Sequence, residues 1–150
     1  MNNRGKEMVL LVEDNPDDVF LTVKALRSQG ATGKVWVARD GVEALDYMKG
    51  RGRFADRETY PLPGLVLLDL NLPNMDGLAV LKGIRATEAV KTTTVVVLTS
   101  ICSERDLHEC YRQGANSFIR KPADYNQFAE VVRQLATYWL ELNESPPPIE

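Results

Sequence analysis

Side chains capable of acid–base or group-transfer chemistry follow several apolar stretches of this sequence. They are those of Glu13, Asp14, Asp69, Thr99 and Lys121. Asp69 comes directly after the unbroken apolar run 65–68, which is typical of a strand buried on both faces. Because an ionised carboxylate is costly inside a core, we expect Asp69 where that strand emerges, at an edge of a sheet.

These groups would form a phosphoryl-transfer site if they lay close together. Crowded carboxylates either bind a proton or are neutralised by a cation. Asp, Glu and Asn oxygens without His or thiolate favour a hard ion such as Mg²⁺. Lys121 offers a positive charge for an anion, and Thr99 offers a hydroxyl donor. A metal ion, an ammonium and a hydroxyl around one carboxylate suit phosphoryl transfer, with Asp69 as the nucleophile.

The elements that must position these groups alternate along the chain. The apolar runs predict five strands, at residues 8–12, 35–38, 65–68, 93–98 and 116–119. Helical spacing and end signals predict helices over about 16–30, 41–50, 77–87, 103–113 and 124–142. Right-handed crossovers then give an α/β fold with a doubly wound parallel sheet. All its strands point the same way, so the polar residues that follow them should meet at one edge.

Local signals mark the helix ends. Asn15 is placed to cap a helix that has Pro16 at its first position, and Gly30 is expected to end it. Apolar faces are expected from Val19, Val23 and Leu26 with Phe20 beside them, and from Val42, Leu45 and Met48 in the second helix. Ser103-x-x-Asp106 resembles a capping box. Residues 51–64 show no sustained period and are either a functional insertion or a solvated loop, and the basic residues within 49–57 favour solvation.

Composition limits the broad class of the protein. The chain has 150 residues, enough for one domain, which we place at 1–150 with a core at about 7–142 and a proline-rich tail at 143–150. A net charge of −3 argues against nucleic-acid binding. The apolar run 8–12 is too short for a signal peptide or a membrane span. Cys102 and Cys110 match no zinc pattern and are expected to be reduced, so the predicted compartment is the cytoplasm.

The combination of motifs resembles one family, the receiver domain of two-component response regulators (the CheY-like fold), over about residues 7–142. The motifs are Glu13-Asp14, Asp69 followed by Leu-Pro-x-Met-Asp-Gly, Thr99-Ser100 and Lys121-Pro122. Each falls at the end of its own predicted strand, in the order typical of receivers. The resemblance implies a flavodoxin-like sheet with strand order 2-1-3-4-5, for which receivers are a standard example.

The resemblance also implies roles for individual residues. Asp69 would accept a phosphoryl group from the phosphohistidine of a sensor histidine kinase. Mg²⁺ would be held by Asp14, Asp69 and the backbone carbonyl of Asn71, with Glu13 reaching it through water. Glu13 stands where receivers often have Asp.

Three further positions have implied roles in switching. Lys121 would pair with the phosphoryl oxygens, and Thr99 would move in to hydrogen-bond one of them. Phe118 would turn inward with Thr99, although an ordinary core residue is the more secure interpretation of this position, and the two roles are compatible. The Lys121–Pro122 peptide bond would be cis.

A narrower resemblance points to single-domain response regulators of cyanobacterial phytochrome kinases. It rests on the insert at 51–64, on Gly114-Ala115-Asn116 and on Tyr138-Trp139-Leu140. It implies a phytochrome-type kinase as donor and a homodimer through the face of the fourth helix, fifth strand and fifth helix. Tyr138, Trp139 and Leu142 would cover that contact or simply end the core. No output domain is expected, so the signal would pass to an unknown downstream protein by contact.

Two other functions are less compatible with this sequence. A receiver fold that binds partners independently of phosphate usually lacks an acidic or lysine position, and none is lost here. A haloacid-dehalogenase-like enzyme needs a second Asp two residues after the nucleophile, where this chain has Asn71, so we expect no enzyme beyond assistance to its own phosphoryl transfer and autodephosphorylation. His108 lies in a charged segment and is expected to be a solvated residue, not a phosphodonor.

Overall fold

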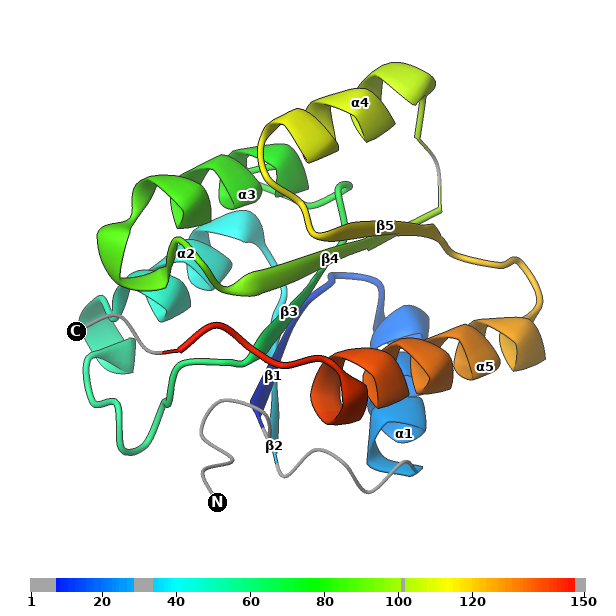
Figure 1. Ribbon diagram of the computed structural model, residues 1–150, viewed down its shortest axis with the longest axis horizontal. Coiled ribbons are helices and arrows are strands. Elements are labelled where there is room, and N and C mark those ends of the chain that lie inside the picture. The colour runs from blue at the N-terminus through cyan, green and yellow to red at the C-terminus, as the bar shows by residue number, and fades with distance from the viewer. Residues whose placement is uncertain (1–7, 29–33, 101, 148–150) are drawn as a thin grey trace.

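A five-stranded parallel sheet forms the centre of the molecule in the computed structural model, which describes residues 8–28, 34–100 and 102–147 (Figure 1). The strand order is β2-β1-β3-β4-β5, as predicted. The strands are β1 (Met8–Val12), β2 (Lys34–Ala38), β3 (Leu65–Leu68), β4 (Thr94–Thr99) and β5 (Ser117–Arg120). The doubly wound α/β class is therefore confirmed.

Backbone hydrogen bonds carry the sheet one residue beyond the strands at the carboxyl edge. The amide of Glu13 donates to the carbonyl of Ala38, and the amide of Asp69 donates to that of Val12, both at 3.0 Å. The amide of Lys121 donates to the carbonyl of Thr99 at 2.8 Å. These bonds fix the backbones of the candidate site residues at one edge of the sheet.

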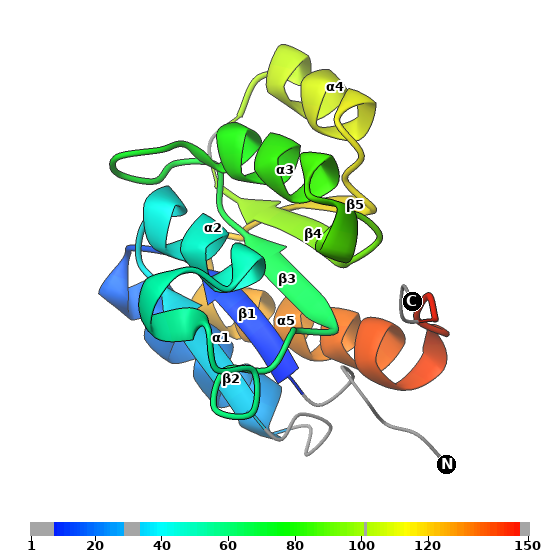
Figure 2. The same cartoon turned by 90° about the vertical axis from the view of Figure 1, so that its left-hand side faces the viewer.

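Helices cover both faces of the sheet, as Figures 1 and 2 show. One core contains apolar residues of α1 and α5, and the other contains those of α2, α3 and α4. Strand residues alternate between the two, so Leu10 and Val12 join one core, whereas Val9 and Leu11 join the other. The helices are α1 (Pro16–Ser28), α2 (Gly41–Lys49), α3 (Gly77–Ala86), α4 (Glu104–Arg112) and α5 (Tyr125–Ala136).

The predicted caps are present, but two expected apolar contacts are not. Asn15 Oδ1 accepts from the amides of Asp17 and Asp18, and Ser103 and Asp106 form the capping box of α4. Phe20 is 65% exposed and Val42 is 44% exposed, because Thr22 and Ala44 take the inward positions of their helices instead. The expected helix end at Gly30 lies outside the described residues.

The last helix differs from its predicted form. The α-helix ends at Ala136, and a π-helical segment, η3 (Thr137–Leu142), continues it. The Thr137 hydroxyl donates to the carbonyl of Arg133 at 3.0 Å, a back-bond of the kind that loosens a regular helix. Residues 144–147 of the expected tail are not helical.

The insert at 51–64 is packed against the domain instead of being a fully solvated loop. It contains a short 3₁₀ helix, η1 (Gly52–Phe54), and a second one, η2 (Glu88–Val90), follows α3. Phe54 is buried among the rings of Trp36, Tyr47 and Tyr60. The Arg57 guanidinium donates to the carbonyls of Met48 and Tyr60, so the expectation of a solvated basic segment is wrong for this residue.

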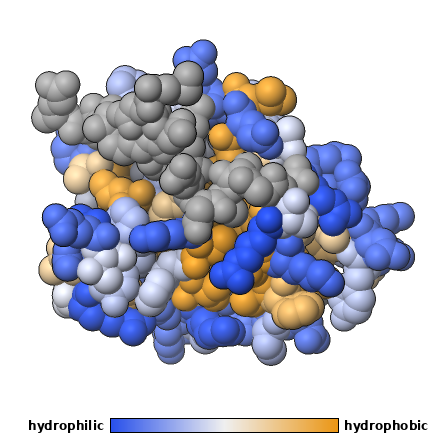
Figure 3. Space-filling view, turned by 90° about the horizontal axis from the view of Figure 1, so that it is seen from below, coloured by the Kyte–Doolittle hydropathy of each residue, from blue (hydrophilic) through white to orange (hydrophobic). Residues whose placement is uncertain are grey.

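Several large apolar side chains of the described residues are exposed at the surface. On the face drawn in Figure 3, hydrophobic atoms gather near the centre within a hydrophilic surround. Among the described residues, the large apolar side chains with the greatest exposure are Leu142, Phe20 and Tyr125. In the part of the chain that the structure describes, no helix is both long and apolar enough to cross a membrane.

Candidate phosphoacceptor site

Asp69 presents its two carboxylate oxygens to different donors at the end of β3. Oδ1 accepts hydrogen bonds from the Thr99 hydroxyl at 2.8 Å and from the Asn71 amide at 3.0 Å. Oδ2 accepts one from Lys121 Nζ at 2.8 Å. The residue is only 6% exposed, so donors and not bulk water set the orientation of the carboxylate.

The turn after Asp69 is tight, and Gly77 makes it possible. A Cβ at position 77 would lie 2.2 Å from the Asp69 carbonyl oxygen, which no side chain could tolerate. Asp76 then caps α3 by accepting from the Ala79 amide at 2.9 Å. The Asp-Gly pair therefore brings the start of α3 against the backbone of Asp69.

Lys121 Nζ lies among several carboxylates at this edge of the sheet. It donates to Glu13, to Asp18 at 2.8 Å and to Asp69. Its side chain is only 5% exposed. The cation that neutralises the crowded carboxylates in this structure is therefore the lysine itself.

The prediction of a cis Lys121–Pro122 bond is wrong for this structure, which has no cis peptide bond among the described residues. Trans is the lower-energy form of an X–Pro bond by about 0.5–1 kcal/mol. From the trans backbone Lys121 already reaches its carboxylate partners, so the observed contacts do not require the cis form.

Burial and hydrogen bonding shift the pKa values of Glu13, Asp69 and Lys121 in different directions. Burial raises the pKa of Glu13 to about 7, even though its hydrogen bond from Lys121 acts in the opposite direction. Burial also acts to raise the pKa of Asp69, but hydrogen bonds from Lys121 and the Asn71 amide outweigh it and lower that pKa. Burial acts to lower the pKa of Lys121, yet its bonds to Asp18, Asp69 and Glu13 raise it above the usual value.

The carboxylate oxygens at this edge of the sheet are ligands of the type that a hard cation prefers. Their present arrangement, however, is not that of a metal site. Within the described ranges, no three His, Cys, Asp or Glu side chains are arranged to hold a metal ion. Asp14 is exposed, whereas Glu13 and Asp69 are buried beside Lys121. Mg²⁺ needs only one or two protein carboxylates, with waters and a phosphate, so the residues present fit such an ion chemically.

The expected switch residues lie on neighbouring strands. Thr99, the last residue of β4, is fully buried with its hydroxyl on Asp69. Phe118 is half-buried on β5 and packs against the core of α2, α3 and α4. Its position is thus compatible with a core residue, and its role in switching stays a prediction. His108 is exposed, as expected.

Sequence reasoning missed Asp18. As an acidic residue in the first turn of α1, it also lies near the positive end of the helix dipole, which is reason enough for its presence there. A positional signal was present, because α1 begins directly after β1 and its first turn must lie at the same edge as Asp69. An acidic residue there is within reach of a long cationic side chain from another strand.

These features define a class of protein. The chain matches the response regulator receiver domain over residues 9–133 and belongs to that family. It is thus a member of a family of signalling proteins, with the receiver fold and divalent-cation chemistry that the family implies.

Within the family, the chain is close to phytochrome response regulators in sequence and structure. It is 33% identical to response regulator Rcp1 of Synechocystis over 135 residues, 90% of each chain. The phosphorylated cyanobacterial phytochrome response regulator RcpA superposes with a TM-score of 0.89 at 35% identity, covering 94% of this chain and 99% of the other. The Mn²⁺-bound form of Rcp1 gives a TM-score of 0.87 at 32% identity, with the same coverage.

A relative of a different kind is also similar. The probable methanogenesis regulatory protein FilR2 of Methanothrix harundinacea is 40% identical over 144 residues, 94% of this chain and 88% of that protein. Sequences similar to this chain therefore occur in proteins whose names refer to different processes.

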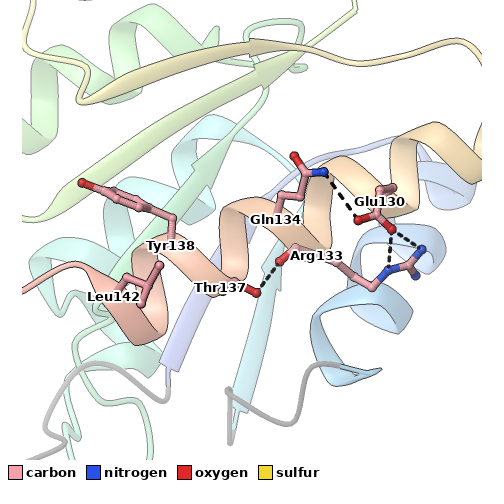
Figure 4. A pocket seen from close by; sticks show the side chains of 6 residues that line it. All are labelled: Glu130, Arg133, Gln134, Thr137, Tyr138 and Leu142. Atoms are coloured by element: carbon pink, nitrogen blue, oxygen red, sulfur yellow. Dashed lines mark hydrogen bonds and ion pairs between the residues drawn. The ribbon is translucent and has the colours of Figure 1, made fainter.

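A second feature is a groove along α5 and η3, far along the chain from Asp69. It is lined by Glu130, Arg133, Gln134, Thr137, Tyr138 and Leu142 (Figure 4). Glu130 accepts from Arg133 at 3.1 Å, which fixes the polar end, while Tyr138 and Leu142 form the apolar end. Tyr138 is 49% exposed and Leu142 is 69% exposed, so this end offers apolar surface to a partner.

Proposed function

We propose that the protein is a phosphoacceptor, with Asp69 taking a phosphoryl group from a sensor histidine kinase. The observation that carries the proposal is the arrangement of donors on Asp69, in which Thr99 and Lys121 hold different oxygens of one buried carboxylate. Those donors would orient the nucleophile before the reaction and would then meet the oxygens of the incoming group.

The transfer would exchange one bond for another. A carboxylate oxygen of Asp69 attacks phosphorus, the bond from phosphorus to the kinase histidine nitrogen breaks, and the nitrogen keeps that electron pair. Lys121 Nζ then pairs with a phosphoryl oxygen, and the Thr99 hydroxyl donates to another. The lowered pKa of Asp69 keeps its carboxylate ionised and nucleophilic near neutral pH.

Divalent-ion binding belongs to the same proposal. Asp14, Asp69 and the Asn71 carbonyl would hold Mg²⁺ or another divalent cation, with Glu13 reaching it through water. When bound, the ion would supply positive charge to the transferred phosphoryl group. The Mn²⁺-bound structure of Rcp1 supports this choice of cofactor.

Incubation with acetyl phosphate and Mg²⁺, followed by intact mass, tests the proposal. We expect the wild type to gain the mass of one phosphoryl group, and Asp69→Asn or omission of the divalent ion to abolish the gain. Asp17→Asn, which changes an exposed carboxylate at the same edge, is the matched control and should be labelled like the wild type. No adduct on the wild type would favour a receiver fold that binds partners independently of phosphate.

We further propose a phytochrome-type kinase as donor, acting with this protein in the cytoplasm. The similarity to Rcp1 and RcpA supports this choice. The test compares phosphotransfer rates from a labelled phytochrome kinase and from a labelled kinase without a phytochrome module. A rate at least about tenfold higher from the phytochrome kinase is expected, and equal rates would contradict the assignment.

The signal would leave by contact with other proteins through the α4-β5-α5 face. Phosphorylation would shift the Thr99 and Phe118 positions together and so change that surface. The same face would form a homodimer, supported by exposed Tyr111 and Tyr125 and by the groove at Tyr138. Tyr138→Ser should weaken dimerisation in size-exclusion chromatography with light scattering, whereas Phe20→Ser on α1 should not. An unchanged dimer in Tyr138→Ser would place the interface elsewhere.

A further inference from the structure

Among the described residues, Asp18 is the carboxylate partner of Lys121 that has no role in binding the phosphoryl group or the divalent ion in the proposed reaction. Its Oδ2 accepts from Lys121 Nζ at 2.8 Å. It comes from a helix and not from a strand end, and its backbone amide is tied to the Asn15 cap at 3.2 Å. The position of Asp18 is therefore fixed by the start of α1, independently of the loop that carries Asp69.

The other two partners of Lys121 have competing roles in the proposed reaction. Asp69 Oδ2 is one of the two oxygens available to form the bond to phosphorus, and Asp69 loses its negative charge as a carboxylate when it becomes an acyl phosphate. Glu13 would turn toward the divalent ion. Only the contact with Asp18 can persist unchanged from the free to the phosphorylated protein.

We propose that Asp18 is a positioning residue, which holds Lys121 Nζ beside Asp69 while the other partners of the lysine are exchanged. The inference rests on the proposed phosphoacceptor function. A lysine side chain has several rotatable bonds, and a fixed carboxylate reduces the freedom that must be lost when the ammonium meets the phosphoryl group.

An opposing effect of Asp18 is its negative charge, which would repel an incoming phosphoryl donor. The Asp18 side chain is 20% exposed, against 5% for Lys121, so water and salt screen its longer-range field more than its direct contact. Contact and charge thus predict opposite outcomes for removal of the carboxylate. Loss of the contact slows labelling, whereas loss of the repulsion speeds it.

Asp17 provides the control for charge. It lies in the same turn of α1, it is exposed, and no side-chain contact joins it to Lys121. Asp17→Asn and Asp18→Asn therefore remove the same charge from nearly the same place, but only the second replaces the charged acceptor of the lysine by a weaker, neutral one. Asp18→Glu restores a carboxylate and tests rescue.

The experiment measures labelling by acetyl phosphate at saturating Mg²⁺ as a function of donor concentration. We expect Asp18→Asn to lower the maximal rate about tenfold with little change in the donor concentration at half-maximal rate. Asp17→Asn should stay within about twofold of the wild type, and Asp18→Glu should recover part of the loss. The defect should persist in about 0.5 M NaCl, where a longer-range charge effect is screened.

Several results would overturn the role. Equal rates for the two Asn variants, or faster labelling of Asp18→Asn, would show that the lysine contact does not assist transfer. A matching loss of Mg²⁺ affinity in Asp18→Asn, measured by calorimetry, would make Asp18 part of the ion site instead. A wild type that is not labelled would overturn the phosphoacceptor function itself and this role with it, and is distinguished from the other outcomes by that control.

Discussion

Two cationic side chains, one at each edge of the sheet, are held in different ways. At the carboxyl edge, Lys121 is surrounded by the carboxylates of Glu13, Asp18 and Asp69. At the opposite edge, Arg85 at the end of α3 donates to uncharged oxygens. These are the carbonyls of Lys91, Thr93 and Gly114 and the side-chain oxygen of Asn116, at 2.7–2.9 Å.

The difference separates a contact that can be exchanged from one that is permanent. Carboxylates compete for the lysine with any anion of similar charge, so under the proposed function a phosphoryl group would replace one of them. Backbone carbonyls have fixed positions, and the arginine fork satisfies several at once, which ties α3, the start of β4 and the loop before β5 together. Burial lowers the pKa of Arg85, whereas the carboxylates raise that of Lys121.

The largest expected effect follows from removing the exchangeable cation. Lys121→Met leaves the buried carboxylates without their ammonium and the phosphoryl group without its partner. We expect labelling by acetyl phosphate to slow at least about 100-fold. Lys82→Met, an exposed change on α3, should label at the wild-type rate. Labelling of folded Lys121→Met within about threefold of the wild type would contradict the role given to the lysine.

The complementary variant removes Arg85, the cation that is held by uncharged oxygens. Arg85→Met leaves its carbonyl acceptors unsatisfied and should lower the free energy of unfolding by about 3 kcal/mol, measured with urea. Labelling of the folded variant should remain close to that of the wild type, because none of the Arg85 partners contacts Asp69. A large labelling defect in a stably folded Arg85→Met would show that the two edges are coupled.

The pH dependence of the free energy of unfolding tests the carboxyl edge, where Glu13 has a raised pKa. Because the pKa of Glu13 rises from 4.5 to about 7 on folding, the folded protein binds a proton more tightly than the unfolded chain. That contribution is fully present below the unfolded value and is lost as pH rises through about 7. Without divalent ions, the wild type should therefore lose up to about 3 kcal/mol relative to Glu13→Gln over this window. A relative gain would show that Lys121 keeps Glu13 ionised throughout.

The smallest expected effect comes from making the Arg85 contact more like that of Lys121. Asn116→Asp replaces a neutral acceptor by a carboxylate at an exposed position. We expect a stabilisation of about 0.5–1 kcal/mol near neutral pH that disappears in high salt. A larger change that salt does not affect would mean that the geometry of the loop, and not charge, had been altered.

Much of this arrangement could be predicted from the sequence because the apolar runs are sharply bounded. Leu65–Leu68 ends at Asp69, and the start and end of β1 agree with the predicted ones. The Ser103 capping box was also evident, because its residues are local in sequence. Each of these features depends on neighbours along the chain.

Two features that escaped prediction depend on contacts between distant segments. Asp18 meets Lys121 across 103 positions of the sequence. Phe54 is buried only because Trp36 and Tyr47 meet it from other elements. Two other differences are local: the hydroxyl of Thr137 bonds to the carbonyl of Arg133 where the π-helical turn begins, and the trans Lys121–Pro122 bond follows the ordinary preference of an X–Pro bond.

Locating the phosphoryl group tests the central claim most directly, since several other carboxylates lie at this edge of the sheet. Borohydride reduces an acyl phosphate of Asp to homoserine, which tandem mass spectrometry can place in the sequence after proteolysis. The labelled protein should carry homoserine at position 69, and Asp69→Asn should carry none. A reduced residue at Glu13, Asp14 or Asp18, with Asp69 intact, would contradict the assignment of Asp69 as the phosphoacceptor.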